Sequence, residues 1–222
     1  WDHPDLDDNI WTNWDEIPDN GIDDDANGYV DDTRGWDFVN DDNDPNDDNS
    51  HGTHVAGIAA AEGNNGIGMC GVNWNARIMP VKMFQSSGIG SSSDLALAIE
   101  YASDNGATVI NYSGGSYGES LTVKTALENA YVGTGTGGGS MLVAAAGNSH
   151  YKIDGADPCK TYGASPKPSY PGCYSFVIGV MSQDAGPCNG FSNWDFTGPV
   201  NSGNQGFNYE IQAPGVGIIS WK

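Results

Sequence analysis

The chain has 222 residues and a formal net charge of −21 at pH 7, from 29 Asp and Glu residues against 8 Lys and Arg. So strong a negative charge argues against nucleic acid and anionic membrane surfaces as partners. The length suits one large domain with a continuous buried core. No apolar run approaches the roughly 20 residues that a membrane-spanning helix needs.

Residues 1–50 carry most of the negative charge, with 18 of the 29 acidic residues and a single basic residue, Arg34. Asp, Asn, Gly and Pro dominate without apolar periodicity, which predicts loops rather than helices or strands. An acidic segment poor in aromatic residues would indicate disorder. This one contains Trp1, Trp11, Trp14, Tyr29, Trp36 and Phe38. We therefore expect a folded acidic loop region, built around bound cations.

One such cation site is predicted by residues 23–31, which repeat the first half of an EF-hand calcium loop. Alternate residues offer oxygen atoms, a glycine at position 28 permits the sharp turn, and a backbone carbonyl completes the series. The expected ligands are Asp23, Asp25, Asn27, Tyr29 and Asp31. Arg34 replaces the closing Glu of the EF-hand, so closure must come from elsewhere, with Asp32 as the candidate. The alternative is a solvated acidic turn.

From residue 51 the pattern changes to alternating helices and strands. Helices are expected at about 52–62, from Ser92 or Ser93 to a stop at 105–106, and at 120–132. Strands are expected at 77–84, 108–111, 141–146 and 176–180, and long loops at 150–172 and 181–210. The last two strands are continuous apolar runs, which are typical of parallel strands covered on both faces. This alternation predicts an α/β fold with a doubly wound, mostly parallel sheet and helices on both faces.

The apolar spacing within the two later helices predicts their buried faces. The residues expected to face inward are Leu95, Ile99, Ala102, Leu121, Leu127 and Tyr131. In doubly wound sheets the working groups gather at the carboxyl ends of the strands. That rule brings together the approach to His51, the turn at 111–115 and the turn at 146–148.

The most specific motif is His51-Gly-Thr-His54-Val-Ala-Gly57, preceded by the polar residues Asn49 and Ser50. It presents an imidazole, which titrates near neutral pH, at the start of an apolar helix. The motif resembles, residue for residue, the histidine motif of the subtilisin-like serine proteases (subtilases, peptidase S8 family). The resemblance extends across nearly all of the chain. It implies that His51 is a catalytic general base and that His54 is structural. A metal site on the two histidines is the competing idea, but it lacks the intervening Glu of the zinc-protease helix.

Two further segments resemble the same family. Val143-Ala-Ala-Ala-Gly-Asn148 resembles the segment that bears the oxyanion-hole asparagine, whose loss in subtilisin costs roughly 10²–10³ in turnover. Asn111-Tyr-Ser113-Gly114-Gly115 resembles the edge on which an extended polypeptide substrate pairs as an added strand. Gly88-Ile89-Gly90 corresponds to the opposite edge. The alternatives are that Asn148 is an ordinary turn residue and that the glycines serve turn geometry only.

The resemblance also implies two more calcium sites. One resembles a loop of thermophilic-type subtilases and would use Asp37, Asp42, Asp44 and Asn46. Because it lies just before His51, a bound ion there would stiffen the approach to the histidine. The other resembles the family's tight calcium site, with Asp5, the Asn65 side chain and the carbonyls of Glu62, Ile67 and Met69. We expect two to three structural Ca²⁺ sites, since so many carboxylates repel one another without cations.

The other two members of the family's catalytic triad are not found in these 222 residues. The aspartate motif, Asp-Thr/Ser-Gly, would precede His3-Pro4-Asp5-Leu6, and the nucleophile motif, Gly-Thr-Ser-Met-Ala, would follow Ala213–Ser220. We therefore expect residues 1–222 to be a partial catalytic domain, incomplete at both ends and inactive by itself. The alternative is a non-catalytic, calcium-bound structural module or filament-forming fragment with the same fold.

Ser116 offers a different serine motif, because Gly114-Gly-Ser116-Tyr-Gly118 fits Gly-x-Ser-x-Gly. That fold next needs an acid and then a histidine. Before His150, the acids are Glu119 and Glu128, both placed at or on the next predicted helix. We therefore do not expect Ser116 to be a nucleophile.

The four cysteines are Cys70, Cys159, Cys173 and Cys188. None forms a Cys-x-x-Cys pair, which argues against zinc or thioredoxin-type chemistry. Cys70 is expected to be a small buried apolar residue, and Cys159–Cys173 is the favoured disulfide. An oxidising, extracellular setting fits that pair, so we expect a secreted protein. Side-chain specificity and self-association are left open.

Overall fold

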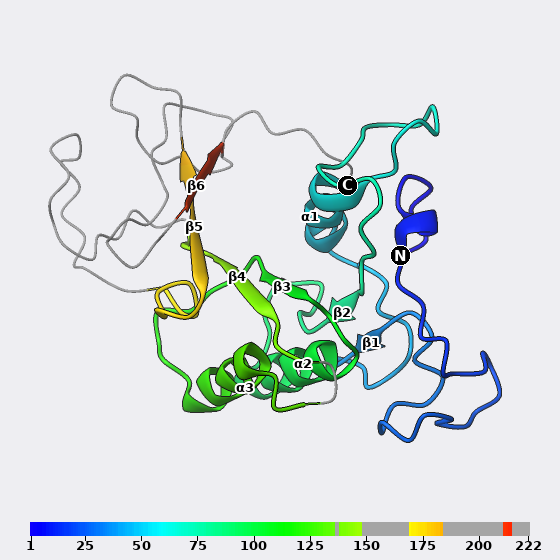
Figure 1. Ribbon diagram of the computed structural model, residues 1–222, viewed down its shortest axis with the longest axis horizontal. Coiled ribbons are helices and arrows are strands. Elements are labelled where there is room, and N and C mark those ends of the chain that lie inside the picture. The colour runs from blue at the N-terminus through cyan, green and yellow to red at the C-terminus, as the bar shows by residue number, and fades with distance from the viewer. Residues whose placement is uncertain (136–137, 148–168, 184–210, 215–222) are drawn as a thin grey trace, which may run out of the picture. The chain divides into compact units, whose positions relative to one another are not determined.

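A computed structural model describes residues 1–135, 138–147, 169–183 and 211–214 (Figure 1). They fall into two compact units, Trp1–Ala102 and the residues from Ser103 onward. The elements are η1 (Asp7–Asn9), β1 (Trp36–Asp37), α1 (His51–Ala60), β2 (Val81–Lys82), α2 (Ser92–Asp104), β3 (Val109–Tyr112), α3 (Leu121–Val132), β4 (Met141–Ala145), β5 (Ile178–Gln183) and β6 (Ile211–Pro214). No helix among the described residues is long and apolar enough to cross a membrane. That residues 1–222 form one catalytic domain stays a prediction.

The first unit begins with the acidic loop region, in which only η1 and β1 are regular, as predicted. β1 pairs in parallel with β2, with Asp37 opposite Lys82. Gly35 makes this pairing possible, because its φ is +127° and a Cβ there would collide with the carbonyl oxygen of Pro80. The strand expected at 77–84 is much shorter than predicted. Pro80 has no N–H to donate to a ladder, and before it only Ile78 forms a bridge, to Ile10.

The first ten residues are attached to the segment that follows α1. The Asn9 side-chain amide donates to the carbonyls of Ala60 (2.9 Å) and Trp74 (3.0 Å). The Asp8 N–H donates to the Glu62 carboxylate at 2.9 Å. The bond to Ala60 satisfies one of the last carbonyls of α1, which have no partner within the helix.

Helix α2 forms where predicted but begins with a different cap. The Ser91 hydroxyl, not that of Ser92 or Ser93, accepts the Asp94 N–H at 3.0 Å. Ile99 and Ala102 are buried as expected, whereas Leu95 is only half-buried. The helix ends before Gly106, whose φ is +80°, as the sequence indicated.

The second unit contains a parallel sheet in the order β3-β4-β5-β6, and α3 connects β3 to β4 along the chain. Parallel strands linked by helices confirm the α/β class (Figure 1). One prediction was wrong here: β5 runs on to Gln183, into the loop expected at 181–210. β6 covers Ile211–Pro214, for which we predicted no element. Glycine-rich flanks and a terminal proline are loop signals, and they mask so short a strand.

Helix α3 confirms its predicted position but corrects its predicted face. Leu127 is buried at 3 % exposure, whereas Leu121 is 75 % and Tyr131 is 52 % exposed. The buried stripe consists of Val123, Ala126, Leu127 and Ala130. Its spacing of three, four and seven residues is helical, but two of its members are alanines. The prediction relied on the large apolar residues Leu121 and Tyr131 and therefore assigned the wrong face of the helix to the core.

Candidate active site

His51 is the first residue of α1 and its side chain is exposed. The residue before it, Ser50, has a left-handed backbone (φ 74°) and its hydroxyl makes no capping bond. The polar approach therefore turns sharply and presents the imidazole at the mouth of the helix, as the motif predicted. His54, one turn later, is buried at 6 % exposure, which fits the structural part that the resemblance implies for it.

Asp47 takes over the capping that Ser50 does not provide. One carboxylate oxygen accepts the N–H and the hydroxyl of Thr53, at 2.8 and 2.7 Å. The other accepts the N–H groups of Asn49 and Ser50, both at 2.9 Å. Burial acts to raise the pKa of Asp47, but these bonds outweigh it and hold the pKa below its usual value. The sequence did not single out this residue, because Asp47 is one of many acids in residues 1–50.

Lys82 ties the same approach to the strand pair. Its ammonium lies 2.9 Å from a carboxylate oxygen of Asp37 and 3.0 Å from one of Asp48. Burial acts to lower the pKa of Lys82, but the two carboxylates raise it above its ordinary value, so the side chain is charged. The Asn49 side chain adds a bond to the Ser86 carbonyl at 2.7 Å. Lys82 was also missed, because it stands alone in an apolar run.

The two predicted substrate edges belong to different units, and each is described by itself. In the first unit, Gly88 has a left-handed φ of 77° within a turn closed by the Gln85 N–H and the Ile89 carbonyl (2.9 Å). Gly90 packs so closely on Met83 that a Cβ there would lie 2.6 Å from the Met83 carbonyl oxygen. This edge is therefore a tight glycine turn in an exposed segment.

In the second unit, Ser113, Gly114 and Gly115 follow β3 and lead into an antiparallel bridge. Ser116 and Tyr170 exchange N–H···O bonds of 3.0 and 2.8 Å, so the backbone beyond Gly115 is already paired. The Asn111 amide donates to the Ser113 hydroxyl at 2.9 Å. Asn148 and His150 lie outside the described residues, so the predictions that concern them stay predictions.

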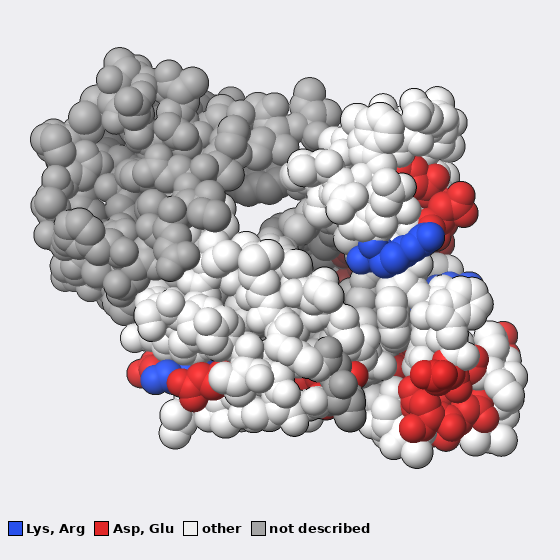
Figure 2. Space-filling model, in the orientation of Figure 1, with Lys and Arg blue, Asp and Glu red and all other residues white. Residues whose placement is uncertain are grey.

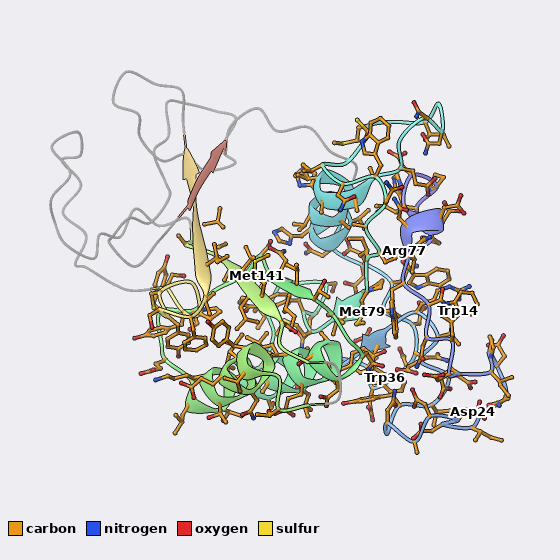
Figure 3. The ribbon with its side chains drawn as sticks, viewed as in Figure 1. Trp14, Asp24, Trp36, Arg77, Met79 and Met141 are labelled. Carbon is orange, nitrogen blue, oxygen red and sulfur yellow. The ribbon has the colours of Figure 1, made fainter. Side chains whose placement is uncertain are left out.

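The acidic loop region gathers carboxylates at one place (Figure 2). Glu16, Asp23 and Asp25 each bring one oxygen to within 4.8 Å of the others, and no other such group of His, Cys, Asp or Glu occurs in the described part of the chain. Oxygen ligands at this spacing fit a hard cation such as Ca²⁺. Glu16 was not predicted, because it precedes the loop motif by seven positions. Asp24, labelled in Figure 3, lies on the same loop.

The rest of this predicted ligand set has other partners. Asp31 accepts the N–H groups of Asn20 and Gly21, at 3.0 and 2.9 Å. Asp32, the candidate for closure, is fully buried and accepts the Tyr101 hydroxyl at 2.6 Å and the Asn13 amide at 2.9 Å. Burial raises its pKa, although those bonds act in the opposite direction. Asp32 thus anchors the loop to α2, and Glu16 is the acid that joins the cluster.

Residues of the predicted tight site are joined by hydrogen bonds. Asp5 is fully buried, and its carboxylate accepts the Asn65 amide at 2.8 Å and the Met69 N–H at 3.1 Å. The side-chain amide oxygen of Asn65 accepts the Ile67 N–H at 3.0 Å, and the backbone carbonyl of Asp5 accepts the Glu62 N–H at 2.9 Å. Residues 62–69 therefore pack against one buried carboxylate, but through N–H groups and the Asn65 side chain rather than through the predicted carbonyls, so the calcium site stays a prediction.

The predicted ligands at 37–46 are not gathered in this way. Asp37 is fully buried and bonded to Lys82. Asp42 accepts the Asp44 N–H at 3.1 Å, and the Asp44 carboxylate accepts the Trp1 indole N–H at 3.0 Å. Asp37, Asp42 and Asp44 do not form a group of three carboxylates like that of Glu16.

The cysteines give one correction. Cys70 is exposed, not buried as we predicted. Cys173 is a buried free thiol, and burial raises its pKa to about 11. Its expected partner Cys159 lies outside the described residues.

Comparison with known proteins gives the family. The model of the subtilase family matches residues 1–221. The chain belongs to the subtilase family. Among related subtilases, the thermophilic serine proteinase of Bacillus sp. (strain AK1) is 38 % identical over 187 residues, which is 84 % of this chain and 39 % of that protein. Thermitase of Thermoactinomyces vulgaris is 41 % identical over 151 residues, 68 % of this chain and 47 % of that protein.

A more distant relative covers nearly the whole chain. Subtilisin-like protease 1 of Plasmodium falciparum is 32 % identical over 221 residues, 99 % of this chain and 31 % of that protein. In each of these three comparisons the matched region spans less than half of the relative's length.

Proposed function

We propose that this subtilase acts as a serine endopeptidase in which His51 is the general base. The observation that carries the proposal is the placement of the histidine motif. His51 opens α1 with an exposed imidazole, and the family match covers residues 1–221. A general base must reach the proton it removes, so exposure at the mouth of a helix suits it. In the proposed reaction His51 takes the proton of a serine hydroxyl as that oxygen attacks a peptide carbonyl.

The remaining roles follow from the family pattern. Asn148 donates from its side-chain amide to the negative charge that forms on the attacked carbonyl oxygen. The segments 88–90 and 113–115 hold an extended polypeptide by backbone pairing. The serine nucleophile and the aspartate belong to motifs that these 222 residues do not contain.

A fluorophosphonate probe, which labels an activated serine, tests the proposal. The full-length protein should be labelled and should cleave casein. His51→Ala should lose at least about 10³-fold in turnover, since triad members act as a unit. Residues 1–222 alone should not be labelled. A full-length protein that is neither labelled nor active would support the alternative of a non-catalytic module.

We also propose that calcium binds at two of the expected sites. Support comes from the carboxylate group of Glu16, Asp23 and Asp25 and from the fully buried carboxylate of Asp5, which lies beside the Asn65 side chain. Calorimetric titration of the full-length protein should detect both. Glu16→Gln should remove one binding event, whereas Asp15→Asn, its exposed neighbour, should not. Equal stoichiometry in the two variants would contradict the first site.

A location outside the cell is part of the same proposal, because extracellular calcium reaches concentrations that saturate weak loop sites. Recovery of the activity from culture medium rather than from cell lysate would support it.

A further inference from the structure

The loop before His51, where we predicted a calcium site, is already paired with a cationic side chain of the protein. The Lys82 ammonium lies between Asp37 and Asp48, at 2.9 and 3.0 Å, with the Lys82 side chain 13 % and the Asp37 side chain 0 % exposed. A buried carboxylate is stable only when paired or fully hydrogen-bonded. Lys82 supplies that pairing from the neighbouring strand, because Asp37 and Lys82 are register partners in β1 and β2.

The carboxylate of Asp37 has no bonding capacity to spare for a further ion. One oxygen accepts the N–H groups of Val39 (2.7 Å) and Asn40 (3.1 Å). The other accepts the Asn40 amide (2.8 Å) and the Lys82 ammonium (2.9 Å). An ionised carboxylate offers about four lone-pair positions, and these four donors occupy them. Asp37 is therefore a poor calcium ligand in this arrangement.

Lys82 also reaches the approach to His51 directly. Asp48, its second partner, follows Asp47, whose carboxylate caps α1 through Thr53. Asn49 is bonded to the Ser86 carbonyl beyond β2. The three residues 47–49 are thus attached to the helix on one side and to the region of β2 on the other. A cation that holds Asp37 and Asp48 together fixes the path of the chain that ends at His51.

We propose that Lys82, rather than a calcium ion, is the cation that closes the loop before His51, and that it thereby positions this histidine. The closure stands on the geometry alone, whereas the positioning of a catalytic base rests on the proposed function. Calcium removal should then loosen the loop around Glu16 and Asp23 but leave residues 47–53 in place.

Hydrogen exchange of the full-length protein, measured by mass spectrometry, separates the two cations. With Lys82→Met, the peptide covering 47–53 should exchange at least about tenfold faster, because the local opening free energy falls. Lys82→Arg, which keeps the charge, should restore slow exchange. Lys124→Met is the matched control, because the Lys124–Glu119 pair is more accessible, with side chains 34 % and 49 % exposed, and 3.9 Å long. If a chelator speeds exchange at 47–53 in the unchanged protein as much as Lys82→Met does, a calcium ion closes the loop and the proposal is wrong.

A second variant keeps the test sharp should Lys82→Met fail to fold. Asp44→Asn removes a carboxylate that a calcium ion would need but that Lys82 does not contact. Calorimetric calcium stoichiometry should be unchanged in this variant. The loss of one bound ion would overturn the proposal.

The positioning role has its own measurement. Lys82→Met should lower kcat about tenfold or more at unchanged KM, because a misplaced base slows chemistry without affecting substrate binding, and Lys82→Arg should recover it. An unchanged kcat with fast exchange would refute the positioning. A full-length protein without protease activity would refute the proposed function and leave the exchange result standing.

Discussion

The chain segment that leads to His51 is held in place by side chains of different chemical types. The histidine itself belongs to a contiguous motif, so its place at the start of α1 could be predicted. Its supports could not. Asp47 is one of many acids in its segment, and Lys82 is 31 positions away. The same holds for Glu16 in its separate cluster with Asp23 and Asp25. The role of each residue depends on which groups the folded chain brings within hydrogen-bonding distance of it. Spacing along the sequence does not predict those contacts.

Asp47→Asn should destabilise the protein by about 1 kcal/mol, the usual value of a helix cap. Asparagine keeps the shape of the side chain but loses its charge. Its NH₂ group replaces one carboxylate oxygen and cannot accept the two bonds that this oxygen accepts in Asp47. Chemical denaturation measures the free energy of unfolding. Asp2→Asn, at an exposed position, is the control and should be neutral. Equal midpoints for both variants would refute the capping role of Asp47.

Cys173 should resist alkylation in the native protein while Cys70 reacts. Cys173 is buried with a pKa of about 11, whereas Cys70 is exposed. Because only the thiolate reacts, labelling of Cys173 should rise about tenfold per pH unit as pH approaches that pKa. Folding favours the neutral thiol, so stability from this group is complete below pH 9 and falls between about 9 and about 11.

Peptide mapping after iodoacetamide treatment reads each thiol separately. If Cys173 stays unlabelled in the denatured, unreduced protein, it is in a disulfide, and Cys159 is then the expected partner. Fast native labelling of Cys173 at pH 8 would contradict its burial.

At the scale of elements, the sequence was most informative where a pattern is long and repeated. Helices α1, α2 and α3 were predicted to within about two residues, because α1 begins within the His51 motif and glycines follow the ends of α2 and α3. The short strands β1 and β6 carry no such pattern, and their pairing depends on neighbours elsewhere in the chain. The family match supplied the fold class with more certainty than the four- to six-residue strands could by themselves.

The corrected face of α3 gives a direct comparison of two leucines on one helix. Leu127→Ala should cost about 2–5 kcal/mol, because it leaves a cavity in a packed interior. Leu121→Ala should lie within about 0.5 kcal/mol of the unchanged protein, as exposed substitutions usually do. Thermal unfolding of the two variants checks both values. The opposite order would restore the face that we first predicted.

At the scale of the whole molecule, the charge of −21 sets how stability depends on ions. Acidic side chains crowd the loops of the first unit (Figure 2), and few bases stand near them. Repulsion among these carboxylates opposes the compact state. Bound cations and internal pairs such as Lys82–Asp37 offset it, so their number decides how far the protein tolerates chelation.

Excess chelator should therefore lower the melting temperature. A site held at about 100 times its Kd contributes about 2.7 kcal/mol, and for a chain of this size that corresponds to roughly 5–10 °C. Differential scanning calorimetry at fixed ionic strength measures the shift, with magnesium as the control ion. An unchanged melting temperature would argue against structural calcium.

The attachment of the first ten residues to the segment after α1 has a consequence for a protein exposed to proteolysis, its own included. A cut in the exposed stretch 17–20 would break the chain without freeing its leading piece. Asn9 remains bonded to Ala60 and Trp74, and Asp5 to Asn65 and Met69. The nicked protein should elute as one particle in gel filtration and separate into two bands only in denaturing electrophoresis. The two pieces would stay together as one folded particle.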